Sequence, residues 1–280
     1  MRTPCSGVVP AERLSLHDVR GFVFDVDGTL AHRDARGRAH PQPGAVEVLQ
    51  RIRASGRPLV LFTNGSHLAA SAIARGLRED GIPVGDDELL TPVESALTYM
   101  ARHHAGQRAQ LFVTEPVRER MASAGVAVTD GDDAEVVFVA HVQETDLDSM
   151  ERAGRAVSRG ARLLTGSYVQ GYAGANGMII SRGAMVTAAI AKAGGARPKI
   201  VGKPSRAAVA QLRAHIGIPT SALAVIGDDL GMDVGLGRLA GSRTVLVRSG
   251  MSSQLDLDRV RPAARPHFVV ENVAALLDAL

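Results

Sequence analysis

The chain has 280 residues, of which 45% are hydrophobic, 22% are charged and 3% are aromatic, and its formal net charge at pH 7 is +3. These values are ordinary for a globular protein, and no apolar stretch approaches the length that a transmembrane helix needs. The arginines are scattered and tryptophan is absent, which argues against nucleic acid as a partner.

The start of the chain and its cysteine content favour an intracellular protein. The segment before residue 21 contains no apolar run of signal-peptide length. The single cysteine, Cys5, cannot form an intrachain disulfide bond. We therefore expect a cytoplasmic protein with no membrane partner. The length favours two domains over one.

Strand-like and helix-like segments alternate along the chain, which predicts βαβ units and parallel sheets. The predicted strands are 21–27, 58–64, 109–114, 136–140, 161–166, 178–180, 199–205, 221–229, 244–250 and 267–270. The predicted helices are 43–56, 67–81, 91–106, 146–160, 206–216 and 273–280. This pattern predicts an α/β fold with a Rossmann-like parallel-sheet core from 1–85 and 196–280, and a second α/β domain inserted at 86–195.

Asp25 and Asp27 stand two apart at the end of the predicted strand 21–27. Side chains at positions i and i+2 of a strand point to the same face, roughly 6–7 Å apart. In open α/β sheets, ligands bind beyond the carboxyl ends of the strands. We therefore expect both carboxylates to project into one site, with Gly28 allowing a sharp turn that exposes its amide nitrogen.

A second acidic group lies at the end of the predicted strand 221–229, where Asp228 and Asp229 are followed by Asp233. Burying several carboxylates together is costly unless a cation neutralises them. Mg²⁺ fits best, because it prefers oxygen ligands and is usually held by one or two carboxylates together with substrate phosphate. The acidic residues thus predict a magnesium site.

Residues that suit a phosphate group end two further apolar runs. Lys203 follows a predicted strand, where an ammonium group can pair with a carboxylate and a phosphate oxygen. Thr63 and Asn64 close the strand 58–64, and Gly65 adds a backbone amide at a helix start. Each pattern alone is more often an ordinary turn, cap or surface charge. All four patterns in this order, each after a β-rich run, are a combination that chance rarely produces.

These residues are where the sequence resembles the haloacid dehalogenase superfamily. FVFDVDGTL, LFTNGS, VGKPS and IGDDLGMDV are similar to the four motifs of that superfamily, in that order. The long insert between the second and third motifs resembles the α/β cap of its NagD-like and p-nitrophenylphosphatase-like branch. The resemblance implies that the cap selects the substrate and excludes water.

The resemblance implies a role for each matching residue. Asp25 would attack phosphorus and become an aspartyl-phosphate, and Asp27 would act as general acid and then as general base. The implied phosphate-binding set is Gly28, Thr63, Asn64, Gly65 and Lys203, of which Thr63 and Lys203 also count as catalytic. Asp25, the main-chain carbonyl of Asp27, and Asp228 would bind Mg²⁺, while Asp229 or Asp233 would act through water or by holding the ligands.

The implied activity is Mg²⁺-dependent hydrolysis of a small phosphorylated metabolite. Phosphoglycolate, glycerol phosphate, a sugar phosphate, a nucleoside monophosphate and pyridoxal phosphate remain equal candidates. The same four motifs would serve a phosphotransferase or phosphomutase. A catalytically silent regulator that binds a phosphometabolite is the alternative from another class, although intact Asp25, Asp27, Lys203 and Asp228 speak against it. The resemblance is also compatible with a homodimer.

The sequence departs from that branch in several places. Met232 stands where the branch usually has threonine, which we expect to perturb the loop without abolishing metal binding. In the insert, Ala140-His141 and the segment 165–168 also differ, so the substrate cannot be carried over. Segment 166–177 is either a specificity loop, with Tyr168, Tyr172 or Asn176 touching the leaving group, or a surface connection. Segment 32–44 carries three arginines and could attract anions at the site entrance, but we favour a solvated hairpin.

Overall fold

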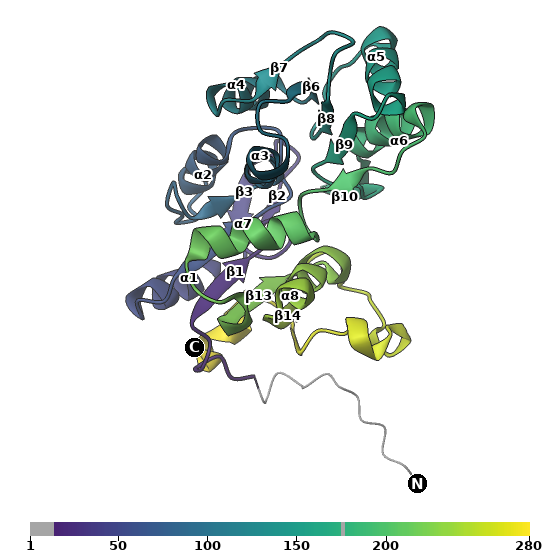
Figure 1. Ribbon diagram of the computed structural model, residues 1–280. Coiled ribbons are helices and arrows are strands. Elements are labelled where there is room, and N and C mark those ends of the chain that lie inside the picture. Colours follow the sequence, from purple (N-terminus) through teal and green to yellow (C-terminus); the bar gives the residue numbers. More distant parts are fainter. Residues whose placement is uncertain (1–13, 175–176) are drawn as a thin grey trace.

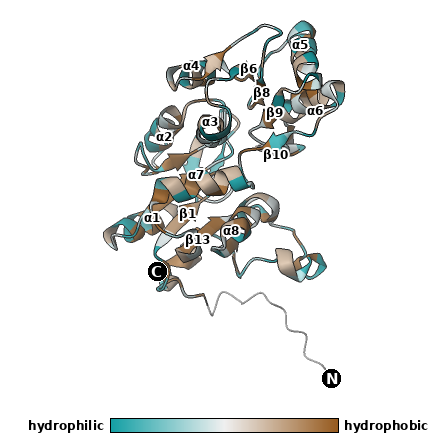
Figure 2. Ribbon diagram, in the orientation of Figure 1, coloured by the Kyte–Doolittle hydropathy of each residue, from teal (hydrophilic) through white to brown (hydrophobic). Residues whose placement is uncertain are grey.

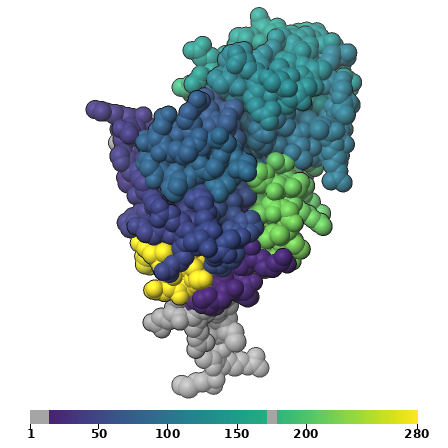
Figure 3. Space-filling model, turned by 90° about the vertical axis from the view of Figure 1, so that its left-hand side faces the viewer, coloured from purple at the N-terminus to yellow at the C-terminus, as the bar shows by residue number. Residues whose placement is uncertain are grey.

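The computed structural model describes residues 14–174 and 177–280. Its helices and strands form two α/β units, each built around its own sheet (Figure 1). Cys5 and Asn176 lie outside the described residues. A space-filling view shows the segment near residue 120–160 at one end of the molecule and the C-terminal segment, in yellow, toward the other (Figure 3). None of the described helices combines the length and apolar character that a membrane span requires.

The first sheet, called the core sheet, has the strand order β15-β14-β13-β1-β4-β5, and all its neighbouring strands are parallel. Its register pairs Val23 with Val225 on one side and with Val60 on the other. Parallel strands of this kind align their carboxyl ends along one edge of the sheet. The strands are β1 (Gly21–Phe24), β4 (Leu59–Phe62), β5 (Leu89–Leu90), β13 (Leu223–Gly227), β14 (Arg243–Val247) and β15 (Phe268–Val270).

The second sheet, called the cap sheet, has the order β12-β9-β8-β6-β7 and is also parallel. Two antiparallel hairpins, β2–β3 and β10–β11, stand apart from both sheets. The cap-sheet strands are β6 (Arg108–Phe112), β7 (Ala127–Val128), β8 (Val136–Val139), β9 (Arg162–Thr165) and β12 (Lys199–Ile200). The hairpin strands are β2 (Ala31–Arg33), β3 (Ala39–Pro41), β10 (Gly171–Gly174) and β11 (Gly177–Ile180).

Helices cover both faces of the core sheet. Successive side chains of a strand point to opposite faces, so apolar side chains on each face can pack against the helices that cover it. Phe22 and Phe24 of β1 pack into one apolar cluster with α1 (Ala45–Ala54) and α2 (Ala70–Glu79). Val23 packs into another cluster with α7 (Arg206–Ile216) and α8 (Gly235–Ala240). Hydropathy colouring shows the apolar character of β13 between these layers (Figure 2). Because both faces of the sheet are covered, its strands are apolar at nearly every position, as the continuous apolar runs in the sequence indicated.

The cap sheet repeats this arrangement. Phe138 and its neighbours pack with α3 (Pro92–His103) and α4 (Glu115–Ser123), whereas Val137 and Val139 pack with α5 (Leu147–Ser158) and α6 (Arg182–Gly194). Helix α3 also contacts α7, and the Thr98 hydroxyl donates to Gln211 between them. A second link joins the Thr114 hydroxyl to the carbonyl of His67 at 2.8 Å. These contacts hold the unit of the core sheet against the unit of the cap sheet.

The predicted α/β class is confirmed, whereas several element details differ. The predicted strand 199–205 shrinks to β12, which pairs with β9 in the cap sheet, and the expected loop 166–177 contains β10. The C-terminal helix is a 3₁₀ helix over Val273–Ala279. β5 belongs to the core sheet although it lies within 86–195, and β12 belongs to the cap sheet although it lies within 196–280. We propose that the inserted domain spans the cap-sheet strands, from about residue 91 to about residue 201.

Candidate active site

The predicted site residues meet at the carboxyl edge of the core sheet. Asp25 follows β1, Thr63 follows β4 and Asp228 follows β13. Lys203 lies in the turn between β12, a strand of the cap sheet, and α7. Residues from four distant parts of the chain are therefore brought together, as the order of the motifs predicted.

A buried lysine joins two of the aspartates. The Lys203 Nζ donates to Asp25 Oδ1 at 2.6 Å and to Asp233 Oδ1 at 2.7 Å. The Lys203 side chain is only 2% exposed, so water screens these ion pairs very little. The other carboxylate oxygen of Asp233 accepts from the Asp229 amide at 3.1 Å. Both oxygens of Asp233 are therefore already engaged.

Asp228 is held by groups that sequence reasoning did not single out. Its Oδ2 accepts from the Met251 amide at 2.6 Å, and the Thr29 hydroxyl lies 3.4 Å from its Oδ1. The same hydroxyl lies 3.3 Å from Asp25 Oδ2, so Thr29 bridges the two carboxylates. Close to them, the Ser249 hydroxyl donates to the carbonyl of Gly28 at 2.7 Å. Thr29 stands inside the first motif and could have been found there, but nothing local marks the loop 249–251.

Two glycines make room for this carboxylate. A Cβ added at Gly28 would lie 2.5 Å from Asp228 Oδ2. The backbone of Gly28 also has a φ of +89°, a conformation that residues other than glycine rarely adopt. A Cβ at Gly250 would lie only 2.0 Å from the same oxygen. The close approach of backbone on both sides excludes other residues at these positions.

The cluster carries more negative charge than its own lysine can neutralise. Carboxylate oxygens of Asp25, Asp228 and Asp233 all lie within 4.8 Å of one another. Burial, together with the neighbouring carboxylates, raises the pKa of Asp228 to about 8. Burial also raises the pKa of Asp233 to about 7 and that of Asp25, although Lys203 opposes both shifts. Three buried carboxylates against one ammonium group suit a hard divalent cation with oxygen ligands.

Lys203 is charged despite its burial. Loss of hydration alone would lower its pKa, but Asp233 and Asp25 outweigh that effect and raise the pKa. The ammonium group is thus a permanent positive charge beside Asp25. It can offset charge on Asp25 and on a bound phosphoryl group.

Asn64 ties three of the motifs together. Its Oδ1 accepts from the Lys203 amide at 3.1 Å, and its Nδ2 donates to the Lys203 carbonyl at 3.3 Å. The same Nδ2 lies 2.8 Å from the sulfur of Met232. The unusual methionine of the fourth motif therefore contacts the second motif. Next to Asn64, the buried Thr63 hydroxyl accepts from the Gly65 amide at 2.9 Å, which shapes the turn.

Asp27 and Asp229 stand outside the buried cluster. Asp27 is exposed, and its Oδ1 accepts from Arg33 Nε at 2.6 Å. Asp229 accepts from the Gly231 and Met232 amides at 2.7 and 2.9 Å, and so caps the next turn. Of Asp229 and Asp233, it is Asp233 that joins Asp25 and Asp228 in the cluster, a difference that the sequence could not show.

The cap side contributes His141. Its ring lies 5.9 Å from the ring of His67, centroid to centroid, across the contact between the two units. Tyr168 is 42% exposed. Whether segment 166–177 touches a leaving group stays a prediction.

We predict that Gly250→Ala weakens both metal binding and catalysis, because its methyl group would displace the Asp228 carboxylate. The expected result is a metal affinity lowered by about tenfold or more, the range seen when a residue that orients metal ligands is removed. Isothermal titration calorimetry with Mg²⁺ measures it. Gly237→Ala is a matched control, since its Cβ would lie 2.4 Å from a Thr244 methyl carbon and near no carboxylate. An equal loss of Mg²⁺ affinity in both variants would contradict the prediction.

Comparisons with known proteins agree with this geometry. Residues 22–127 match the family model described as haloacid dehalogenase-like hydrolase, and residues 200–276 match a second model described as HAD-hydrolase-like. The chain is 30% identical to the ribonucleotide monophosphatase NagD of Escherichia coli K12 over 263 residues, which covers 92% of this chain and 98% of that protein.

Solved structures give the same picture. A 4-nitrophenylphosphatase from Thermotoga maritima superposes with a TM-score of 0.85 and 26% identity, covering 94% of this chain and 98% of the other. A glycerol phosphate phosphatase from Mycobacterium tuberculosis, in complex with magnesium, superposes with a TM-score of 0.82 and 26% identity, covering 94% and 78%.

Proposed function

This chain belongs to the haloacid dehalogenase-like hydrolases as a NagD-like phosphatase acting on small phosphorylated substrates, and on that premise we propose that it is a Mg²⁺-dependent phosphomonoesterase working through an aspartyl-phosphate at Asp25. The observation that carries the proposal is the buried contact between Lys203 and Asp25, beside Asp228 and Asp233. A carboxylate held next to a fixed cation suits attack on an anionic phosphoryl group.

The residues that would hold the metal follow from their hydrogen bonds. Asp25 and Asp228 are the carboxylate ligands that we propose, together with the main-chain carbonyl of Asp27. Asp233 supports them by holding Lys203 and the Asp229 amide, since both of its oxygens are engaged. When bound, Mg²⁺ would neutralise charge on the phosphoryl oxygens and on the carboxylates.

In the first step, an Asp25 oxygen attacks phosphorus and the ester P–O bond breaks. Asp27, whose side chain is exposed beside the site, serves as the general acid and delivers a proton to the leaving oxygen. Lys203 and the backbone around Thr63 to Gly65 hold the phosphoryl oxygens. The products of this step are the free alcohol and phosphorylated Asp25.

In the second step, water attacks phosphorus and Asp27 removes its proton. The bond between phosphorus and Asp25 breaks, which releases inorganic phosphate and restores the carboxylate. Release of inorganic phosphate, with no transfer to an added alcohol, distinguishes this hydrolase from a phosphotransferase. The physiological substrate, a homodimer and the cytoplasmic location stay predictions.

We predict that the chain releases phosphate from p-nitrophenyl phosphate only with a divalent cation. EDTA should stop the release, and Mg²⁺ should restore it. At a Mg²⁺ concentration ten times its Kd, the free energy of unfolding should rise by about 1.4 kcal/mol. Activity assays and thermal denaturation with and without Mg²⁺ measure both effects.

Asp228→Asn supplies the test of the metal site in this prediction. It should lose the thermal response to Mg²⁺ and most of the activity, because it removes a proposed ligand. Asp148→Asn on the exposed start of α5 is the control and should change neither. Metal-independent release by the native chain would remove the proposed role of Mg²⁺.

A further inference from the structure

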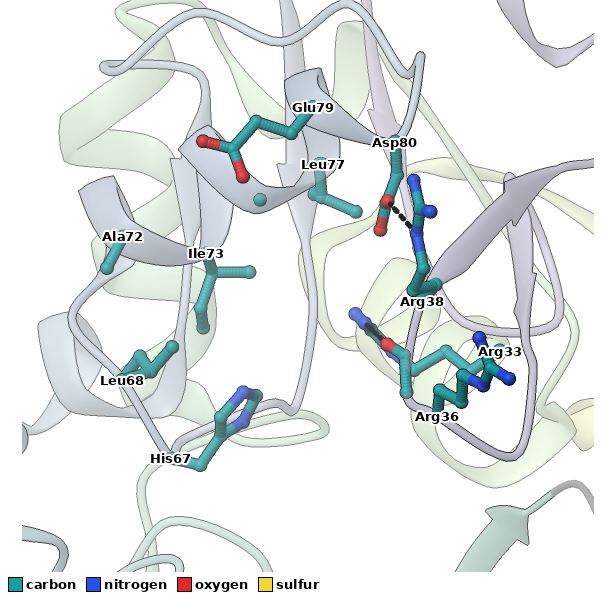
Figure 4. Close-up of a pocket in the computed structure, with 12 residues that line it drawn as sticks. Arg33, Arg36, Arg38, His67, Leu68, Ala72, Ile73, Leu77, Glu79 and Asp80 are labelled. Carbon is teal, nitrogen blue, oxygen red and sulfur yellow. Dashed lines mark hydrogen bonds and ion pairs between the residues drawn. The ribbon is translucent and has the colours of Figure 1, made fainter.

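Hairpin β2–β3 and helix α2 enclose a hollow of about 360 Å³ beside the candidate active site (Figure 4). Arg33, Arg36 and Arg38 lie along its hairpin wall, and His67 and Ile73 lie on the opposite wall (Figure 4). We call it the arginine hollow. Each wall follows a site motif along the chain: the hairpin follows the Asp25 motif, and His67 follows the Thr63 motif. Arg33 of the hairpin wall contacts Asp27 at 2.6 Å, so the hollow adjoins the candidate active site at Asp27.

The three arginines differ in their partners. Arg33 is held by Asp27 at 2.6 Å and by the carbonyl of Gly37 at 3.0 Å. Arg38 donates to Asp80 at 3.1 Å, as the dashed line in Figure 4 marks. Within residues 14–174 and 177–280, the Arg36 guanidinium makes no ion pair or hydrogen bond. Arg36 is also exposed, so its donors are available to a ligand.

The remaining charges of the hollow leave Arg36 as its principal anion-binding group. Asp27 offsets Arg33, and Asp80 offsets Arg38. Glu79, at the C-terminal end of α2, adds one carboxylate to the opposite wall (Figure 4). Burial, together with His141 and Arg33, holds the pKa of His67 below its usual range. A neutral imidazole there can donate to or accept from a ligand without adding charge.

Resting on the proposed function, we propose that the arginine hollow receives the leaving group of the substrate and that Arg36 binds a second anionic group on it. A guanidinium group binds a carboxylate or a phosphate through two parallel N–H donors, so either anion fits. The preferred substrates are thus phosphomonoesters whose alcohol part itself carries a carboxylate or a phosphate. Arg33 links the hollow to Asp27, the residue that protonates that same alcohol.

Two matched pairs of ligands test the proposal. The first pair is 3-phosphoglycerate and glycerol 3-phosphate, which differ by a carboxylate in place of a hydroxymethyl group. The second pair is fructose 1,6-bisphosphate and fructose 6-phosphate. Arg36→Met should lower kcat/KM for the anionic member by about tenfold relative to its neutral partner, which is the loss of one charged hydrogen-bonded contact. Arg75→Met, an exposed arginine of α2 outside the hollow, should leave this ratio unchanged.

A binding experiment separates this proposal from the proposed function. Calorimetric titration of the four ligands into Mg²⁺-loaded Asp25→Asn, with and without Arg36→Met, requires no turnover. A shift of the affinity ratio, found together with a native chain that releases no phosphate from p-nitrophenyl phosphate or from any of the four ligands, would overturn the phosphatase mechanism and keep the subsite. A response confined to one pair identifies the anion as carboxylate or phosphate. An unchanged ratio for both pairs in Arg36→Met and Arg36→Glu, or no binding of either anionic ligand, would overturn the subsite.

Discussion

Asp25→Asn is expected to lower the rate of phosphate release by about 10⁴-fold or more, the scale of loss when an attacking group is removed. An amide has nearly the same shape as the carboxylate but cannot form the acyl phosphate. The fold should persist, because Lys203 keeps its contact with Asp233 at 2.7 Å. Burial raises the pKa of Asp25, so a neutral side chain is tolerated there and the melting temperature should not fall.

Steady-state phosphate release and thermal denaturation measure these two expectations. Asp18→Asn is a suitable control, because Asp18 pairs with Arg243 before β1, at the opposite edge of the core sheet. Mass spectrometry of acid-quenched native chain should show one added phosphoryl group on the peptide that contains Asp25. Release that survives in Asp25→Asn, or a phosphoryl group on another residue, would contradict the assignment of the nucleophile.

Lys203→Met is expected to have the second largest effect, on both activity and stability. It leaves the carboxylates of Asp25 and Asp233 buried without their cation. Breaking a buried ion pair from one side costs about 3–5 kcal/mol of the free energy of unfolding. We expect about 3 kcal/mol, because Asp233 has a pKa of about 7 and readily takes up a proton. The activity should fall by about 10²-fold or more, since a preorganised charge at the phosphoryl group is lost.

The signature of this role is the response to metal. Without Lys203, Asp25 has lost the ammonium group that paired with it, so Mg²⁺ should raise the melting temperature of the variant by more than it raises that of the native chain. Chemical denaturation and thermal denaturation with Mg²⁺ measure both quantities. Lys192→Met, an exposed lysine of α6, should change neither. A Lys203→Met chain as active as the native one would overturn the proposed role.

Much of the fold follows from local patterns. The apolar runs around Val23, Val60 and Val225 are β-rich and bounded by polar residues, so they predicted three parallel strands, which the structure pairs side by side. The two-residue strands β5 and β7 carry no such pattern, because two residues cannot show a period, and β12 was predicted as the longer strand 199–205. Their membership of a sheet depends on the strand that lies beside them.

The sequence by itself determined the α/β class, the four motifs at strand ends, and Asp25, Lys203 and Asp228 as members of one site. Only the tertiary structure decided that Asp233 reaches this site while Asp229 caps a turn. It also placed the loop of Met251 against Asp228. The physical reason is that periodicity and turn residues report contacts within a few residues along the chain. Contacts between distant segments depend on the path of the whole chain.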